Sequence, residues 1–307
     1  MSFFKNDVVG LPPFFVKRVG GFSALSETIP WGIERSNLRN VWELTRGEDV
    51  TVVVLDTGYS NHPDNCNEEK GESFCWESDV VDMNGHGSHV AGTIGACDNE
   101  SGVIGVAPEV RVISCKVMDK FGMGDDKCLY EGLLYCLKND VDVVNVSMGG
   151  PKKMGRRIEN VLRRLYHKGT HVICAAGNVG RDNSVLYPAR SNFVRAIGAT
   201  DLNNKIADFS SRGVEVDHAA PGVDILSTYK NQEYAVLDGT SMACPYFAGL
   251  VALSVSARRK AGKKDRPVSV VNQIAIENSI DHGPEGQDSK FGYGIVDPLR
   301  FVTDVVG

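Results

Sequence analysis

The stretch VTVVVLD, residues 50–56, decides the fold class of this 307-residue chain. Apart from Thr51, every residue before the final aspartate is apolar, and four of them are valine. Half-exposed strands alternate apolar and polar residues, whereas strands covered on both faces of a parallel sheet are continuously apolar. Similar runs recur at residues 110–117, 141–147, 171–177 and 193–199.

Patterns typical of helices lie between or after these runs. Residues 126–138 and 157–168 repeat apolar positions at intervals of three and four, and an apolar helix is predicted over 241–258, with another near 268–278. Alternating strands and helices predict an α/β fold in which a mostly parallel central sheet carries helices on both faces.

Composition excludes several classes of function. The net charge of −6 argues against a nucleic acid or an anionic membrane as partner, because both require a basic surface. No uninterrupted run of 18 apolar residues occurs, so we expect no membrane span. Asp7 and the Pro12-Pro13 pair interrupt the apolar patches near the N-terminus, which do not read as a signal peptide. We therefore expect a cytoplasmic protein.

The eight cysteines do not by themselves predict a disulfide framework. An even number in a long chain without a signal peptide is weak evidence for disulfides, and no Cys-x-x-Cys pair indicates structural zinc. Cys115 and Cys174 lie in strand-like runs and are expected to be inert core residues. Cys66 and Cys75 flank an acidic loop and are candidates for a pair, but we expect free thiols.

Three polar residues stand where chemistry is expected in such a sheet. Asp56 ends a strand, His86 lies in NGHGSHVAG ahead of an apolar helix, and Ser241 lies in DGTSMACP at the start of the long helix. Catalytic groups of parallel sheets gather at the carboxyl ends of the strands. An imidazole can take the proton of a serine hydroxyl when a carboxylate orients it, and a helix N-terminus favours developing negative charge.

Each of these residues also has a plain structural interpretation. An aspartate at a strand end can be a cap, a single histidine can be a core residue, and a serine before a helix can be an N-cap. From spacing alone, these alternatives stay open.

The three blocks VVLDTG, NGHGSHVAG and DGTSMACP resemble the signature blocks of the subtilisin-type serine proteases, in that family's order of Asp, His and Ser. The resemblance covers about residues 26–300 and includes HPD, GVIGVAP, NVSMGGP and CAAGN. It implies a single-domain subtilisin-like fold over residues 26–307 and a serine endopeptidase that works through an acyl-enzyme. The resemblance implies that Ser241 is the nucleophile and His86 the general base. It implies that Asp56 is the carboxylate that orients His86 and that Asn178 donates a hydrogen bond to the oxyanion.

Cys244 is a second candidate nucleophile, three residues after Ser241. It stands where the family usually has a small residue, and Tyr246 stands where histidine is common. Neither is a catalytic position of the family, so the resemblance assigns the nucleophile to Ser241.

Two other functional classes remain as alternatives. A catalytically silent binding module of the same fold is disfavoured because Asp56, His86, Asn178 and Ser241 are all intact. An esterase is disfavoured because no Gly-x-Ser-x-Gly motif surrounds Ser241.

The resemblance also implies that a protein or peptide substrate binds as an added strand. The P1 residue is the one whose carbonyl is attacked, and Gly149 and Gly150 are expected to leave room for its side chain between them and Ala175–Gly177. Asp125 and Asp126 suggest a basic residue at P4, or alternatively are ordinary acids at a helix N-terminus. The expected substrate-binding residues are Gly122, Gly124, Ser147, Met148, Gly149, Ala175 and Gly177.

Calcium is the metal that the resemblance implies, because hard oxygen donors on a flexible loop suit this ion. By position, the donors are the side chains of Glu27, Asp64 and Asn99 and the carbonyls of Cys97, Ser101 and Val103.

Residues 1–25 are expected to be an extension ahead of the peptidase domain. A short extension resembles the intracellular subtilisins, where a proline-containing segment lies across the active site and inhibits the enzyme. VVGLPPFFV at 8–16 is the candidate segment, since proline keeps a chain extended and resists cleavage. A surface strap or a disordered tail is the alternative. The sequence indicates no oligomeric state and no preference at P1.

Overall fold

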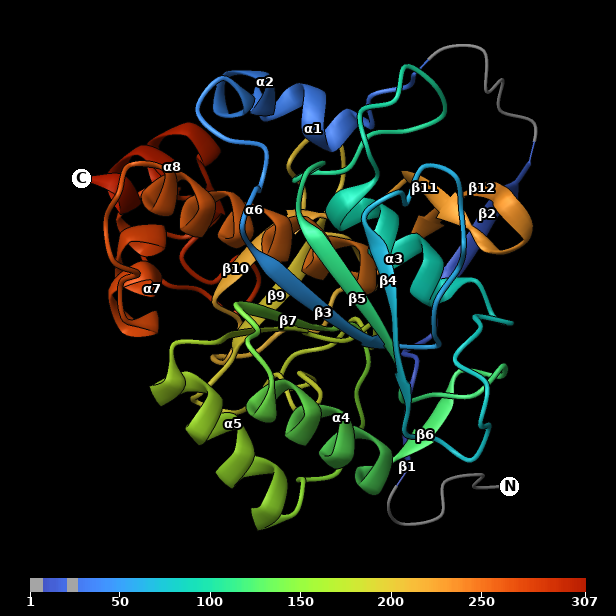
Figure 1. Cartoon of the computed structure of the whole chain (residues 1–307). Helices are drawn as coiled ribbons and strands as arrows, with labels where there is room; N and C mark the ends of the chain where they lie inside the picture. Colours follow the sequence, from blue (N-terminus) through green and yellow to red (C-terminus); the bar gives the residue numbers. More distant parts are fainter. Residues whose placement is uncertain (1–7, 21–26) are drawn as a thin grey trace.

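The computed structural model describes residues 8–20 and 27–307. Within this part of the chain, seven strands form one sheet in the order β10-β9-β8-β7-β3-β5-β4, and every neighbouring pair is parallel (Figure 1). The strands of this sheet are β3 (Thr51–Asp56), β4 (Glu68–Ser73), β5 (Arg111–Lys116), β7 (Val143–Val146), β8 (His171–Ala175), β9 (Arg195–Thr200) and β10 (His218–Pro221).

Helices cover both faces of this sheet, as the sequence predicts. α4 and α5 lie on one face, while α3, α6, α7 and α8 lie on the other (Figure 1). The helices are α1 (Trp31–Arg35), α2 (Leu38–Trp42), α3 (His86–Gly95), α4 (Asp126–Lys138), α5 (Arg156–Lys168), α6 (Thr240–Lys260), α7 (Val268–Glu277) and α8 (Pro298–Val306), with a 3₁₀ turn η1 (Lys230–Gln232).

The core has two halves, one on each side of the sheet, and β3 shows how one strand serves both. Val52 and Val54 belong to the half that contains α3 and α6, and Val53 and Leu55 belong to the half that contains α4 and α5. Successive side chains of a strand point to opposite faces, so a strand buried on both sides must be apolar throughout. This confirms the interpretation of the stretch 50–56.

Smaller β-elements lie outside the central sheet. β11 (Ile225–Tyr229) and β12 (Glu233–Asp238) form an antiparallel hairpin that β2 (Phe15–Val19) extends to three strands. β1 (Val8–Gly10) pairs with β6 (Met123–Asp125), and β13 (Ser279–Ile280) pairs with β14 (Ile295–Val296).

Helix α6 is long and apolar enough to cross a membrane by length and composition alone. It is instead the central helix of this fold, since every residue from Thr240 to Ala257 is buried inside the protein. Burial on all sides explains why its sequence is apolar around the whole circumference.

We call residues 8–20 the strap, because this segment lies across the surface of the domain. Its first part, β1, pairs with β6, and its second part, β2, pairs with β12. The rest of the predicted extension, residues 1–7 and 21–25, lies outside the described residues.

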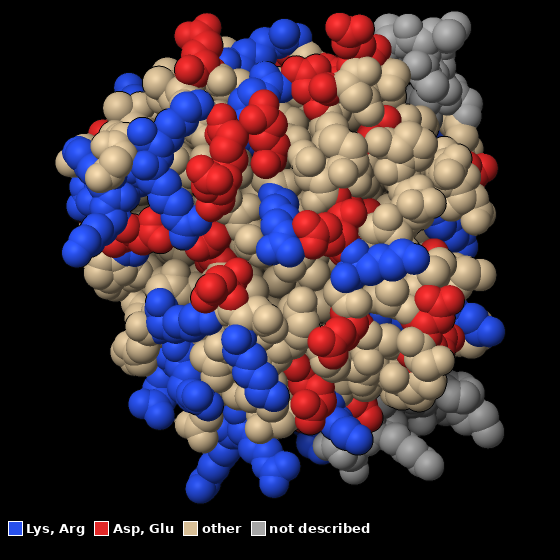
Figure 2. Space-filling model, viewed as in Figure 1, with Lys and Arg blue, Asp and Glu red and all other residues tan. Residues whose placement is uncertain are grey.

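The surface carries charges of both signs. Figure 2 shows acidic and basic side chains interspersed over one face, with Lys and Arg gathered at the lower left, where α5 lies. On α5 the arginines at positions 156, 157, 163 and 164 are all exposed. The negative charge of the chain is therefore unevenly distributed.

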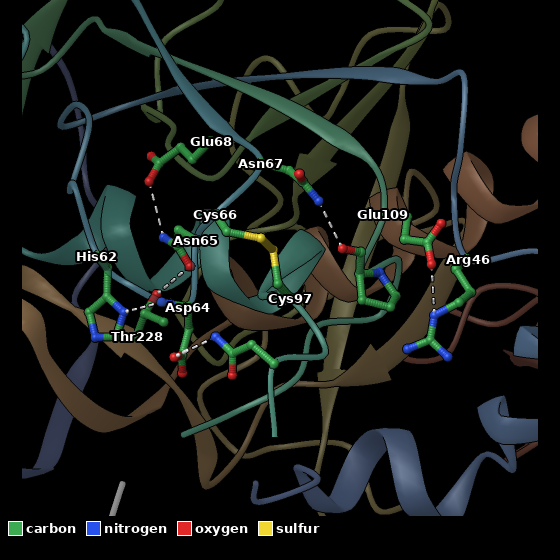
Figure 3. The surroundings of a disulfide bond; sticks show 12 residues. Arg46, His62, Asp64, Asn65, Cys66, Asn67, Glu68, Cys97, Glu109 and Thr228 are labelled. Atoms are coloured by element: carbon green, nitrogen blue, oxygen red, sulfur yellow. Dashed lines mark hydrogen bonds and ion pairs between the residues drawn. A yellow bond between two sulfur atoms is a disulfide. The ribbon is translucent and has the colours of Figure 1, made fainter. Parts of the chain in front are cut away.

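The structure corrects the expectation that Cys66 is a free thiol. Cys66 forms a disulfide with Cys97, 31 residues further along the chain (Figure 3). Cys75, the other candidate partner, is free. Cys115 and Cys174 are buried free thiols, as expected, and burial raises the pKa of Cys115 to about 12.

Loss of this disulfide is expected to destabilise the protein. Cross-linking residues 31 apart restricts the unfolded chain, so Cys66→Ser is expected to lower the free energy of unfolding by about 3–4 kcal/mol. Urea unfolding without reductant measures the change. Cys75→Ser, which removes a free thiol, is the control and is expected to stay within about 0.5 kcal/mol of the wild type. Equal stability of the two variants would contradict the bond.

Candidate active site

Asp56 and His86 form a buried pair at the carboxyl edge of the sheet. Asp56 is the last residue of β3 and His86 is the first residue of α3. Asp56 Oδ1 lies 2.8 Å from His86 Nδ1, and both side chains are fully buried. The carboxylate thereby holds the ring with its proton on Nδ1, which leaves the lone pair on Nε2. Nε2 has no hydrogen-bond partner among the described residues.

Asp82, which the sequence analysis missed, fixes the start of α3. Its Oδ1 accepts hydrogen bonds from the backbone N–H of Gly85 and from the Thr57 hydroxyl, both at 2.8 Å. Its Oδ2 accepts from the N–H and the hydroxyl of Ser88. A carboxylate at a helix N-terminus satisfies backbone donors and complements the helix dipole. Asp82 therefore positions His86 without touching it.

Ser241 lies in the first turn of α6, at the helix N-terminus. Its hydroxyl donates a hydrogen bond to the backbone carbonyl of Ser147 at 3.1 Å, and not to His86. The structure therefore places Ser241 in the expected element, but its hydroxyl makes no hydrogen bond to the histidine.

Cys244 lies one turn further along α6 and is fully buried. Its thiol donates to Asn145 Oδ1 at 3.1 Å, and burial raises its pKa to about 12. A buried thiol with a raised pKa stays protonated and unreactive, which agrees with Ser241 as the nucleophile.

Asn178 is held beside the start of α6 by Thr240. The Asn178 side-chain oxygen accepts from the backbone N–H of Thr240 at 2.9 Å and from its hydroxyl at 2.7 Å. These bonds leave the amide nitrogen of Asn178 to face the site, where it donates to the carbonyl of Pro13 at 2.8 Å. A residue of the strap thus presents a peptide carbonyl to the predicted oxyanion donor.

The strap binds between two of the predicted substrate-binding segments. Gly10 and Gly149 exchange both backbone hydrogen bonds, at 3.2 and 3.0 Å, and Leu11 N–H donates to Gly122 O at 2.9 Å. Gly124 pairs with Val9 in the β1–β6 ladder. The structure therefore brings Gly122, Gly124 and Gly149 together around an extended chain.

The remaining predicted substrate-binding residues have different environments. Ser147 accepts the hydroxyl of Ser241, whereas the side chain of Met148 is buried in the core beside α4 and α5. Ala175 ends β8, and Gly177 lies beside Leu186, a residue that the sequence analysis did not single out.

Asp125 is the N-cap of α4, because its carboxylate accepts from the backbone N–H of Cys128 at 2.8 Å. This geometry is the helix-terminus alternative that the sequence left open for the pair Asp125 and Asp126.

Asp64 lies at the centre of the predicted calcium donors. Its carboxylate accepts from the backbone N–H of Val103 at 2.8 Å and from the side-chain amide of Asn99 at 3.3 Å. Its carbonyl accepts from the N–H of Cys97 at 2.7 Å. The loop that carries the carbonyls of Cys97, Ser101 and Val103 therefore folds onto Asp64 (Figure 3).

The environment of the Glu27 carboxylate shows whether these residues fit a cation. Its neighbour Thr28 donates to Gly102 O at 2.7 Å, which ties Glu27 to the same loop. Glu27 Oε1 is buried without a hydrogen-bond partner in the described part of the chain, and burial and the charge of Asp98 raise its pKa. A cation bound by oxygen donors would neutralise this carboxylate, so the residues fit Ca²⁺.

Most of the predicted calcium donors are backbone carbonyl oxygens and a side-chain amide, and not a cluster of acidic side chains. Over residues 8–20 and 27–307, no group of three His, Cys, Asp or Glu side chains is arranged to hold a metal. The predicted set includes only two carboxylates, Glu27 and Asp64, and depends on backbone carbonyls for the rest.

Comparison with known protein families matches residues 47–294 to the Subtilase family. The match includes Asp56, His86, Asn178 and Ser241, and excludes the strap.

Individual relatives are similar over most of this chain. It is 40% identical to an intracellular serine protease of Paenibacillus polymyxa, over 83% of this chain and 81% of that protein. It is 43% identical to subtilisin Savinase of Lederbergia lenta, over 74% of this chain and 84% of that protein.

A third relative is longer. The chain is 35% identical, over 89% of its length, to the minor extracellular protease Epr of Bacillus subtilis, but spans only 42% of that protein. It likewise spans 63% of the M-protease of Shouchella clausii. Because the family match covers most of the chain and includes the buried Asp56–His86 pair, the chain belongs to the subtilase family.

Proposed function

We propose that this protein is a serine endopeptidase whose nucleophile, general base and orienting carboxylate are Ser241, His86 and Asp56. The observation that carries the proposal is the strap at Asn178. The amide of Asn178 donates to the carbonyl of a bound peptide segment, next to the start of α6 and beside the buried Asp56–His86 pair.

The reaction follows from these positions. When a substrate replaces the strap, the Ser241 hydroxyl turns from Ser147 O to His86 Nε2, which takes its proton as Ser241 Oγ attacks the scissile carbonyl. The oxyanion receives hydrogen bonds from the Asn178 amide and the Ser241 N–H. His86 then protonates the leaving amine, and water hydrolyses the acyl-enzyme with His86 again as base.

Replacement of the nucleophile tests this assignment. Ser241→Ala is expected to reduce the hydrolysis of unfolded casein by on the order of 10⁶-fold, because no acyl-enzyme can form. Cys244→Ala is the matched control on the same helix and is expected to keep activity, since the thiol is buried and protonated. Labelling with a fluorophosphonate, which reacts with activated serines, gives a second readout. Activity that survives in Ser241→Ala would refute the nucleophile.

We also propose that the strap inhibits the enzyme. Gly10 lies opposite Gly149, so continuing the antiparallel register by two residues places Pro12 opposite Ser147. Proline has no N–H, so Pro12 cannot donate to the Ser147 carbonyl, and the hydroxyl of Ser241 donates to that carbonyl instead. The strap therefore supports a state in which the nucleophile is turned away from its base.

Three further contacts, made by Phe14 and Lys17, hold the strap over the site. The ring of Phe14 lies 4.9 Å from that of His86, and Lys17 makes ion pairs with Asp224 at 2.6 Å and with Asp238 at 2.9 Å. Asp238 is nearly buried, so this pair is less screened than a surface ion pair. Phe14 thereby packs against the ring of His86, and the ion pairs of Lys17 anchor the strap to the β11–β12 hairpin and its entry.

Removal of the extension tests the inhibition. Deletion of residues 1–25 is expected to raise the initial rate on casein, and Lys17→Ala is expected to raise it by less, because it weakens only one anchor. Initial rates are compared at equal amounts of folded enzyme. Equal rates for the full chain and the truncated chain would contradict inhibition and leave the strap with a structural role.

Calcium is proposed as a structural ion held by the side chains of Glu27, Asp64 and Asn99 and by loop carbonyls at 97, 101 and 103. When bound, it would neutralise the two carboxylates and tie the loop to the domain, and it takes no part in the reaction. The support is the orphaned oxygen of Glu27.

Removal of the metal tests this site. A chelator is expected to lower the melting temperature of the wild type, and Asp64→Ala is expected to be less stable and insensitive to calcium. A ligand present at 100 times its Kd stabilises a fold by about 2.7 kcal/mol, which a thermal scan detects readily. A melting temperature that is the same with calcium and with chelator would contradict the site.

The location in the cell is also a proposal. Similarity to an intracellular serine protease favours the cytoplasm, whereas other relatives are named as extracellular. The Cys66–Cys97 disulfide favours an oxidising compartment, because cytoplasmic thiols are kept reduced. Mass spectrometry of protein extracted with a thiol-blocking reagent tests the redox state of Cys66: a blocked Cys66 would favour the cytoplasm, and a Cys66–Cys97 disulfide would favour an oxidising compartment.

A further inference from the structure

The space expected to receive the P1 side chain is bounded by two glycines, Gly149 and Gly177. A methyl group added at Gly149 would come within 2.9 Å of Leu186 Cβ, and one added at Gly177 would come within 2.7 Å of Leu186 Cγ. The side chain of Leu186 therefore lies against both glycines, in the space between the two substrate-binding segments.

Backbone hydrogen bonds on both sides hold Leu186 in this place. Its N–H donates to Ala176 O at 2.9 Å. The next residue, Tyr187, exchanges two backbone hydrogen bonds with Gly150, at 2.9 and 3.0 Å. Val185, on the other side, is buried in the core. The backbone of Leu186 is thus tied to both walls of the space.

The strap runs beside this space. Gly10 pairs with Gly149, and two residues further along Pro12 is buried, whereas Pro13 is exposed.

We propose that Leu186 forms the floor of the P1 pocket and restricts cleavage to bonds that follow small residues such as alanine and serine. This inference rests on the proposed peptidase function and names the class of substrate. A phenylalanine ring at P1 would need the volume that Leu186 occupies, and a packed site does not accept extra atoms without displacement. A charged side chain would lose its hydration against the leucine without gaining a partner.

A competition experiment on the full chain tests the pocket. Two tetrapeptide anilides that differ only at P1, with Ala or Phe, are mixed in one reaction, so the ratio of their kcat/KM values does not depend on how many sites the strap covers. The wild type is expected to favour Ala by at least about tenfold. Leu186→Gly is expected to shift the ratio toward Phe by about tenfold or more. Leu186→Met, of similar volume, is the matched control and is expected to keep the ratio within about threefold.

The outcomes separate this inference from the function on which it rests. If fluorophosphonate labels Ser241 but the enzyme prefers Phe at P1, the peptidase function is supported and the role of Leu186 in the P1 pocket is refuted. An unchanged ratio of kcat/KM values in Leu186→Gly would refute that role in the same way. If Ser241 is not labelled and neither anilide is cleaved, both in the full chain and in the chain that lacks residues 1–25, the proposed function is overturned and the inference with it. If Leu186→Gly fails to fold, Leu186→Ala takes its place, and the wild-type ratio alone still decides.

Discussion

The burial of helix α6 is the constraint on which the site depends. From Thr240 to Ala257 every residue is enclosed, so the helix has no freedom to shift along or about its axis. Its first residue, Thr240, bonds to Asn178 and, through its hydroxyl, to Gly177 N–H at 3.1 Å. The same packed helix therefore sets the positions of Ser241 and Asn178, the proposed nucleophile and the proposed oxyanion donor.

The second determinant of the site is the sheet itself. β3 ends at the edge of the sheet where α3 begins. Asp56, the last residue of β3, therefore meets His86, the first residue of α3. An apolar strand that is covered on both faces places its terminal carboxylate out of water, where its bond to the imidazole is strong. Burial of the sheet thus both stabilises the fold and keeps water away from the Asp56–His86 pair.

Much of the fold could be predicted from the sequence, because local patterns decide it, whereas the grouping of Asp56, His86 and Ser241 was expected only from the resemblance to a family. The five predicted strands and the helices at 126–138, 157–168, 241–258 and 268–278 all exist, with small differences at their ends. β4 was not predicted because Glu68–Ser73 is a polar strand at the edge of the sheet, where one side faces water.

Contacts between distant parts of the chain could not be predicted from local sequence patterns. The partner of Cys66 lies 31 residues away, and only the folded loops bring the two thiols together. The space beside Gly149 and Gly177 looked open because glycines leave room, but Leu186, from a separate loop, fills it. Asp82 was missed for the same reason, since its partners are spread over residues 57–88.

The strap has a consequence for the hairpin beneath it. β2 is the third strand of a small sheet, so while it is in place the outer side of β12 is paired. Without β2, β12 becomes an edge strand with free N–H and C=O groups, the kind of edge at which other chains add strands. Asp224 and Asp238 would then stand beside that edge without Lys17, and unpaired charges of one sign discourage such addition. The residues that anchor the strap thus also protect the surface that it leaves.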